Sequence, residues 1–238
     1  MATIGLGLAP VVRDRGGRTS DRVFAELVAA IRDLRLPPGR LLSEAELAVE
    51  LQVSRTPLRE ALARLADAGL LQVLPQVGTL VARIRMRDAE EARFIRETLE
   101  TAAFDLACTR RPDVARLRDV LDVQRVAADR GDMDAFFMAD EALHAGIFEL
   151  SGYPGAWTAV QRSKFQLDRL RRLSLPDTET VDDLIDEHAL IVDALEVGDS
   201  AGGQAHIRRH ARRVLEFGPR LRAQYPDYFV DEPAMGRR

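Results

Sequence analysis

The hydrophobic positions of the first third of the chain follow the period of three short amphipathic helices. The first helix is predicted over residues 20–36, because apolar residues recur every three or four positions and Pro-Pro-Gly ends it. The second begins at the capping pattern of Ser43 with Glu46, and the third, which Ser54 is expected to cap, stops at Gly69. Their apolar faces consist of Val23, Leu27, Ile31 and Leu34; of Leu47 and Leu51; and of Leu58, Ala61, Leu62 and Leu65.

After Gly69 the pattern changes to that of two short strands, "LLQVL" and "TLVAR", which the segment "PQVG" joins. Three helices and a hairpin within about 65 residues predict a winged helix-turn-helix. From Asp88 onward there is no strand pattern, and most of the helical stretches are separated by glycine or proline. The predicted helices there span residues 88–109, 112–130, 132–150, 155–174, 177–197 and 199–222. The fold class is therefore mainly α: an N-terminal winged helix-turn-helix domain followed by an all-α six-helix bundle.

These elements divide the chain into two domains. The winged helix-turn-helix is predicted over residues 18–84 and the helical domain over residues 88–222, with a linker at 85–87. Residues 1–17 and 223–238 are predicted to be flexible tails. The N-terminal residues lack the charged start and apolar core of a signal peptide, and no apolar run approaches the roughly 20 residues of a membrane span.

Composition and charge favour a cytoplasmic protein with two differently charged parts. Of 238 residues, 46% are hydrophobic and 30% charged, which is typical of a globular protein. The single cysteine, Cys108, excludes an intramolecular disulfide framework and fits a reducing compartment. The net charge of −4 argues against a strongly basic nucleic-acid binder. However, 12 arginines against 9 acidic residues give residues 1–85 a charge of +3, whereas 22 basic against 29 acidic residues give residues 86–238 a charge of −7.

The start of the third predicted helix has the side chains that a DNA-reading helix needs. A helix-turn-helix places the N-terminal residues of its second helix against base edges in the major groove. These residues must be polar and face away from the core, and arginine suits guanine edges or phosphates. Arg55 and Arg59 are one turn apart, and Thr56 adds a short hydroxyl. The alternative is an ordinary helix with solvated arginines, but the capped helix before it and the hairpin after it favour DNA binding.

Four polar residues lie on the otherwise apolar faces of three helices in the bundle. Asp140 and His144 are one turn apart on one stripe, while His188 and His210 lie on the stripes of two later helices. A buried carboxylate is costly unless it is paired or binds a metal, and residues at i and i+4 can share one ion. The residues leave two interpretations open: a metal site, or a core histidine hydrogen-bonded to Asp140 with the others unrelated. His206 and His210 form a rival H-x-x-x-H pair, unless His206 lies on the surface.

The helix-turn-helix region closely resembles the GntR family of bacterial transcription regulators, above all in "VSRTPLREALARLADAGLL" and in the glycine of the wing. The resemblance implies DNA contacts from four residues at the start of the third helix: Ser54, Arg55, Thr56 and Arg59. It also implies that the wing around Gly78 approaches the minor groove. Two departures are expected to change affinity or site preference. Ala45 stands where the family usually has arginine, and the wing lacks the usual basic residue beside its glycine.

The helical part resembles the FCD ligand-binding domain of the FadR-type branch of this family, so that the resemblance covers residues 18–222. It implies a metal site with one aspartate and three histidines: Asp140, His144, His188 and His210. His206 matches no ligand position. Members of the branch sense small organic acids, which implies that Arg96 pairs with a carboxylate, although the residues alone favour a surface ion pair with Glu100. Tyr153, where the family commonly has asparagine, is expected to alter the pocket entrance or the next helix start.

The predicted function is a ligand-responsive transcription regulator without catalytic residues. A homodimer would read a pseudo-palindromic operator in double-stranded DNA, and the helical domain would bind a small carboxylate effector and a divalent metal, namely Zn, Ni, Mn or Fe(II). The linker near residues 83–85 would transmit the effector's state. One alternative is a regulator with a purely structural metal and no effector. The other is a metal-dependent hydrolytic enzyme, but there is no H-E-x-x-H motif, and Glu141 and Glu187 are expected to point away from the ligands.

Overall fold

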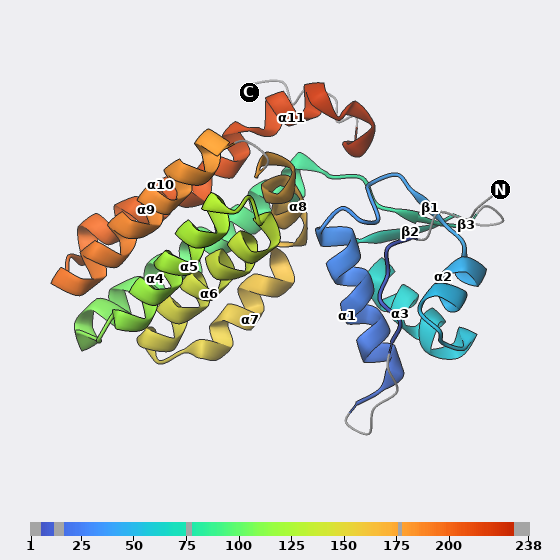
Figure 1. Cartoon of the computed structure of the whole chain (residues 1–238), viewed down its shortest axis with the longest axis horizontal. Coiled ribbons are helices and arrows are strands. Elements are labelled where there is room, and N and C mark those ends of the chain that lie inside the picture. Colours follow the sequence, from blue (N-terminus) through green and yellow to red (C-terminus); the bar gives the residue numbers. More distant parts are fainter. Residues whose placement is uncertain (1–5, 12–16, 75–77, 176–177, 231–238) are drawn as a thin grey trace. The chain divides into compact units, whose positions relative to one another are not determined.

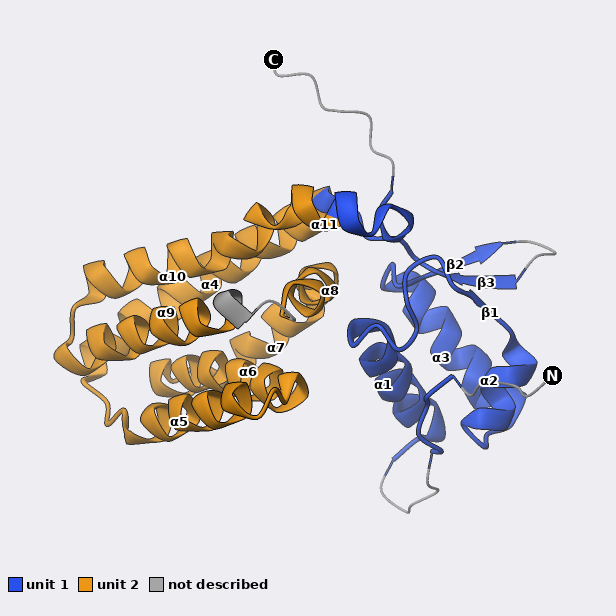
Figure 2. Ribbon diagram, turned by 45° about the horizontal axis from the view of Figure 1, so that its top comes forward, with its two compact units in different colours: residues 1–86, 222–238 blue, residues 87–221 orange. Residues whose placement is uncertain are grey.

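The chain is mainly α-helical, as predicted, and forms two compact units (Figure 1). The computed structural model describes residues 6–11, 17–74, 78–175 and 178–230. Unit 1 contains residues 1–86 together with 222–238, and unit 2 contains residues 87–221 (Figure 2). The predicted order, in which the winged helix-turn-helix comes before the helical domain, is therefore observed. However, the C-terminal residues, predicted to be a separate tail, belong to unit 1.

Unit 1 is a winged helix-turn-helix. Its elements are α1 (Thr19–Arg32), β1 (Leu41–Leu42), α2 (Glu44–Glu50), α3 (Arg55–Asp67), β2 (Leu71–Leu74) and β3 (Gly78–Val81). The strands form an antiparallel sheet in the order β1-β3-β2, in which β1 is an addition to the predicted hairpin. The predicted apolar faces of the helices are buried apart from Leu34, which follows the end of α1 with a φ of 61°. Ser43 accepts a hydrogen bond from the backbone N–H of Glu46, so the predicted cap of α2 is confirmed.

Part of the predicted N-terminal tail packs against unit 1. The backbone N–H groups of Leu6 and Leu8 donate to the carboxylate of Glu50, at 2.7 and 3.0 Å, and both leucine side chains are buried. This differs from the prediction of a flexible tail over residues 1–17. The physical reason is that Glu50 on α2 supplies acceptors for an extended backbone that could not satisfy its own donors.

The predicted C-terminal tail differs in the same way. Its described residues contain the end of α11 (Gly218–Gln224) and the short 3-10 helix η1 (Pro226–Tyr228). The backbone N–H of Ile84 donates to the carbonyl of Tyr228 at 2.8 Å, and Phe229 is only 3% exposed. The aromatic residues of this segment give it enough apolar surface to pack on a folded unit.

Unit 2 is an all-α bundle. Its helices are α4 (Met86–Arg110), α5 (Ala115–Asp129), α6 (Met133–Ser151), α7 (Pro154–Ser163), α8 (Phe165–Ser174), α9 (Thr178–Val197) and α10 (Ser200–Glu216), and α11 crosses the boundary between the units. Two of the six predicted helices are each broken in two. Pro219 has no backbone N–H and so begins a new helix, α11, instead of extending α10. Lys164 separates α7 from α8. No described helix combines the length and hydrophobicity needed to cross a bilayer.

The core of unit 2 requires a glycine where α10 approaches α4. Phe104 of α4 is fully buried, and a Cβ at Gly203 of α10 would lie 2.1 Å from two of its ring carbons. Two carbon atoms cannot approach this closely, so any larger residue at this position forces α10 away from α4. Helix α10 also carries His210, which Arg96 of α4 contacts.

Replacing Gly203 by alanine is therefore expected to lower the free energy of unfolding by about 1–3 kcal/mol through overpacking. Denaturant unfolding followed by circular dichroism measures this change. Gly155→Ala is the matched control, because a Cβ there meets nothing within 4 Å and should change stability by no more than about 0.5 kcal/mol. Equal stability of the two variants would show that α10 and α4 are not in close contact.

Candidate metal centre and nucleic-acid interface

Three helices of unit 2 bring the four predicted ligands together. Helix α6 supplies Asp140 and His144 one turn apart, α9 supplies His188, and α10 supplies His210. All four side chains are buried, and each offers one ligand atom within 4.8 Å of the others. The ring centroids of the three histidines are 4.6 to 5.3 Å apart. The arrangement predicted from the helical stripes is therefore present in the structure, while His206 lies outside the cluster.

Each histidine has a polar partner behind its ring. The Nδ1 atom of His144 lies 3.3 Å from the carboxylate of Glu100 but makes no hydrogen bond to any described residue. The Nδ1 atom of His188 lies 2.9 Å from the side-chain oxygen of Gln124. In His188, where Nδ1 is held by an acceptor, the Nε2 atom is left with its lone pair pointing inward, which is the arrangement of metal-ligating histidines.

His210 is held in the same way, by a residue that was expected to point elsewhere. Its Nδ1 atom lies 3.1 Å from Oε2 of Glu187, which is on α9 one residue before His188. The side chain of Glu187 also forms an ion pair with Arg213 at 3.2 Å. The prediction that Glu187 points away from the ligands is wrong, because it reaches across to α10 and orients a ligand ring.

Sequence reasoning missed these orienting residues, although one had a visible signal. Gln124 is fully buried in α5, one turn after Leu121 and two turns after Leu117 on the same apolar face. A polar residue in an apolar stripe is the signal that identified Asp140. Glu100 was noticed only as a partner of Arg96.

The surroundings of three of the predicted ligands favour the protonation states that a metal requires. Burial lowers the pKa of His188 and of His210 well below the usual range, so both rings are neutral and retain a lone pair. Burial favours the protonated form of Asp140, but the charge of Arg171 outweighs it and holds the pKa of this carboxyl well below the usual range. The Nε2 atom of His188 is buried, lies 3.5 Å from Asp140 and has no hydrogen-bond partner among the described residues. A buried nitrogen lone pair without a hydrogen-bond donor is available to bind a metal cation.

Arg96 lies inside the cluster and not on the surface. Its Nη2 atom is 2.6 Å from Nε2 of His144 and 3.3 Å from Nε2 of His210. The ion pair with Glu100 is present, with 2.8 Å between Nε and Oε1, but both side chains are buried, which corrects the expectation of a solvated pair. Arg96 lies on the buried face of α4, one turn after Ala92 and one turn before Glu100, both of which are buried as well.

A second charged network adjoins the cluster. Arg171 of α8 forms ion pairs with Asp140, with Glu141 at 2.8 Å and with Asp168 at 3.1 Å. Lys164 binds Glu141 and Asp168, each at 2.7 Å. Asp140 is itself one of the predicted ligands, and the charges of the other four groups cancel, with two carboxylates against two cations. The network therefore ties Asp140 to α8 without adding net charge beside the cluster.

A pocket beside the cluster has both charged and apolar walls. It is lined by Arg96, Arg171, Ser174, Leu175, Leu184, His210, Arg213, Val214 and Phe217. Three arginines and one predicted metal ligand thus face the same space, and these charges with an apolar wall suit a small carboxylate. The space open to a water-sized molecule is about 20 Å³, room for about one water, so an acid enters only if lining side chains move. Tyr153 does not line this pocket: its side chain is 60% exposed and precedes α7.

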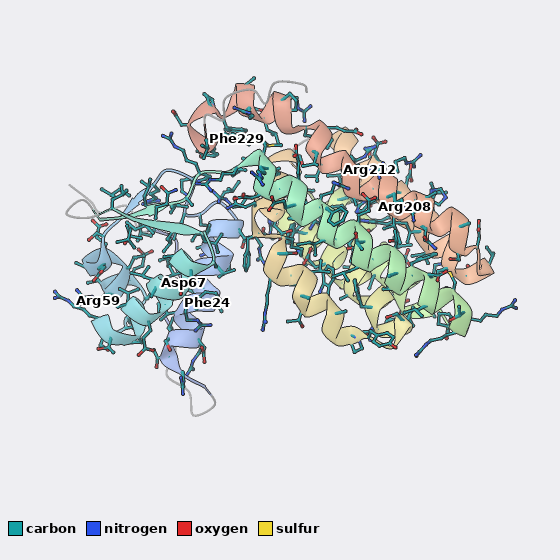
Figure 3. The ribbon with its side chains drawn as sticks, turned by 180° about the vertical axis from the view of Figure 1, so that it is seen from behind. Phe24, Arg59, Asp67, Arg208, Arg212 and Phe229 are labelled. Atoms are coloured by element: carbon teal, nitrogen blue, oxygen red, sulfur yellow. The ribbon has the colours of Figure 1, made fainter. Side chains whose placement is uncertain are left out.

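The predicted DNA-reading residues lie exposed on the first turn and a half of α3. They are Ser54, Arg55, Thr56 and Arg59. Figure 3 shows Arg59 at the outer surface of unit 1. The expected cap is absent, because the side chain of Ser54 makes no hydrogen bond to α3 and stays available. Arg59 donates to Glu44 at 2.9 Å in an exposed ion pair, which solvent screens and DNA phosphates can replace.

An open hollow between α1 and α3 extends this surface. It is lined by residues 17–20 of α1 and its N-terminal flank, and by Ser54, Thr56, Pro57 and Glu60. The N-termini of both helices border the hollow, and free backbone N–H groups at helix N-termini favour phosphate oxygens. Sequence reasoning missed the contribution of α1, because a shared border between two helix ends depends on their packing.

Two further positions named from the sequence lie elsewhere in unit 1, on β3 and on α2. Gly78 begins β3 with a φ of 138°, a backbone conformation that L residues with side chains rarely adopt. The tip of the wing, residues 75–77, lies outside the described residues. Ala45 is exposed on α2, so the family's arginine would have had room at this position.

Each of the two units matches the model of a known protein family. The family model for bacterial regulatory proteins of the gntR family matches residues 19–81, and the FCD domain model matches residues 91–213. An HTH-type transcriptional regulator of Streptomyces ambofaciens is 39% identical over 221 residues, covering 92% of this chain and 93% of the relative. The protein belongs to the GntR family. The HTH-type transcriptional repressor RspR of Escherichia coli is 31% identical over 199 residues, covering 83% of this chain and 87% of RspR.

Solved structures of the GntR family share the fold. McbR of Escherichia coli matches with a TM-score of 0.73 at 24% identity, covering 87% of this chain and 98% of McbR. The protein is therefore a DNA-binding transcription regulator with a winged helix-turn-helix and an FCD domain.

Proposed function

We propose that this GntR-family regulator binds its operator as a homodimer and that a small organic acid, bound beside a metal in unit 2, changes its affinity for DNA. The observation that supports this most strongly is the convergence of three oriented imidazoles and one carboxylate next to a pocket with three arginines. A structural role alone requires no such pocket.

The metal would be held by Asp140, His144, His188 and His210. Three imidazoles and one carboxylate suit Zn, Ni, Mn or Fe(II). When bound, such an ion supplies positive charge and open coordination positions for the oxygen atoms of an acid. The buried Nε2 atom of His188 and the acceptors behind the rings of His188 and His210 support this assignment.

Arg96 would bind the acid. Its guanidinium now contacts Nε2 of His144 and of His210, so a metal and Arg96 compete for the same lone pairs. With those lone pairs occupied, the guanidinium remains in the pocket wall and can pair with a carboxylate in two parallel hydrogen bonds. Metal and acid would therefore bind cooperatively, and the acid would act by binding one conformation more tightly than another.

Operator recognition would use Ser54, Arg55, Thr56 and Arg59, with the wing around Gly78 at the minor groove. Two copies related by a two-fold axis would read two half-sites of a pseudo-palindrome. A regulator of bacterial transcription acts on the chromosome, so we place it in the cytoplasm.

The test is operator affinity, measured by fluorescence anisotropy on a duplex selected from random sequences. We expect the Kd of metal-loaded protein to change on titration with at least one of a panel of mono-, di- and tricarboxylic acids. Arg96→Gln should weaken the response to the acid by roughly 10- to 150-fold in acid concentration, since a charged hydrogen-bonded pair is lost. Arg93→Gln removes a similar ion pair with Glu97 from α4 outside the pocket and should respond normally. Thermal stabilisation by metal without an effect of any acid would instead support a purely structural metal.

A further inference from the structure

The C-terminal segment of the chain is attached to the DNA-binding unit by backbone hydrogen bonds. Ile84 donates to the carbonyl of Tyr228 at 2.8 Å and accepts from the N–H of Val230 at 3.0 Å, which makes a parallel bridge between Ile84 and Phe229. Ile84 is fully buried and Phe229 is 3% exposed. Figure 3 labels Phe229 on the segment that follows α11. A buried bridge of this kind holds the segment in a defined place on unit 1.

The point of attachment lies next to the wing. Ile84 follows the end of β3 by three residues and precedes α4 by two. Val81, the last residue of β3, accepts from the N–H of Gly39 at 2.9 Å. The carbonyl oxygen of Asp227 is 3.6 Å from the place where a Cβ of Gly39 would be. The segment thus contacts both Ile84, which lies between β3 and α4, and the loop before β1, so a displacement of the segment reaches the sheet.

At its N-terminal end, the C-terminal segment continues from α11 and α10, and α10 carries His210 of the predicted metal cluster. Helix α10 continues through Phe217 into α11, of which Leu221 is buried. In Figure 2 the last part of α11 has the colour of unit 1 and the preceding helix that of unit 2. The chain from His210 to Phe229 consists mostly of the end of α10, α11 and η1, so it is a series of short helices and not a long irregular loop. The chain therefore passes between the units twice, near residue 86 and near residue 221.

We propose that residues 222–230 are a second connection, which transmits the state of the metal and effector cluster to the DNA-binding unit. The surface around Ile84 is the docking site, and the chain's own C-terminal segment is its partner. The two crossings are joined to each other by the Ile84–Phe229 bridge. A shift of α10 at His210 is then passed to the end of β3, so the linker at 85–87 is not the only route. This inference rests on the proposed function for the nature of the ligand.

The main comparison in the test is between two substitutions of Val230. Val230→Pro removes the N–H that donates to Ile84, whereas Val230→Ala keeps it. Phe229→Ala removes the buried ring, and a chain that ends at Val230 is the control for shortening. The measured quantity is the ratio of operator Kd values without and with metal and acid, which typically lies at about 5–150 in coupled systems. We expect full-length protein, Val230→Ala and the shortened chain to share one ratio, and Val230→Pro and Phe229→Ala to bind one metal per chain with a ratio close to 1.

A second measurement separates this inference from the proposed function. Spin labels at Asp67→Cys in unit 1 and Arg130→Cys in unit 2, on a Cys108→Ala background, report the distribution of distances between the units. Val230→Pro should broaden that distribution relative to Val230→Ala, whether or not any acid changes operator binding. A full-length protein that ignores metal and acids would overturn the proposed function alone. Identical distributions for the two variants, or an unchanged ratio in Val230→Pro, would overturn the second connection.

Discussion

Replacing His188 by alanine is expected to abolish stoichiometric metal binding and the stabilisation that comes with it. His188 is fully buried, and its Nε2 atom faces Asp140 with no other partner among the described residues. Metal at about 100 times its Kd stabilises a native protein by about 2.7 kcal/mol, and we expect His188→Ala to lose this increment. The metal-free variant should remain folded, because Arg171 still neutralises Asp140.

Metal content by elemental analysis and melting temperature with and without metal measure this effect. His206→Ala is the matched control, since His206 lies on α10 but outside the cluster. Gln124→Leu provides an intermediate case: it removes only the acceptor behind His188 and should weaken metal binding by roughly 10- to 100-fold. If His188→Ala bound metal as tightly as the His206 variant, the ligand set would have to be abandoned.

Replacing Arg55 by alanine is expected to weaken operator binding more than any other single change in unit 1. Arg55 is exposed at the first position of α3, where a reading helix contacts base edges. Loss of a guanine contact costs roughly 1–3 kcal/mol for each half-site, or about 5- to 150-fold, and a dimer loses it twice. Metal content and melting temperature should not change, because the side chain contributes nothing to the core.

Anisotropy titrations on the operator and on an unrelated duplex measure this loss. Arg125→Ala in α5 removes the same charge from an exposed ion pair in unit 2 and is the control for net charge. A loss of specificity, seen as a smaller ratio between the two duplexes, distinguishes a base contact from a phosphate contact. Normal operator affinity in Arg55→Ala would place the reading surface elsewhere.

The local patterns of the sequence predicted most of the fold. The apolar faces of the first three helices are buried as their periodicity indicated, and the capping residue Ser43 marks the start of α2. Most helix breaks at Gly and Pro were predicted because these residues act through their own backbone, but the break before Pro219 was missed. The break at Lys164 was also missed, since nothing in its local sequence interrupts a helix. The side chain of Lys164 is buried and pairs with Glu141 of α6, a contact that only tertiary packing makes.

The difference between local sequence patterns and tertiary contacts also explains which residues of the candidate site could be predicted. Asp140 and the three histidines could be predicted because each is a polar residue on an apolar stripe, and stripes meet in a core. Arg96 was expected at the surface, because its position beside the stripe said nothing about the depth of α4 in the bundle.

No sequence pattern indicated the contacts between segments that are far apart in the chain. The attachment of Phe229 at Ile84 joins residues that are far apart in the sequence, and it uses backbone groups that every residue except proline possesses. The docking of Leu6 and Leu8 on Glu50 is of the same kind. Both segments were predicted to be tails for lack of periodicity, but aperiodic segments can still find acceptors on a folded surface.

Anomalous scattering tests most directly whether each chain binds one metal ion at the cluster of Asp140 and three histidines. Crystals of protein purified without chelator would be measured above and below the absorption edge of the metal found by elemental analysis. We expect one anomalous peak per chain, about 2.0–2.2 Å from a carboxylate oxygen of Asp140 and from the Nε2 atoms of the three histidines. A fully ordered cluster with no peak, or a peak bound by other residues, would contradict the account.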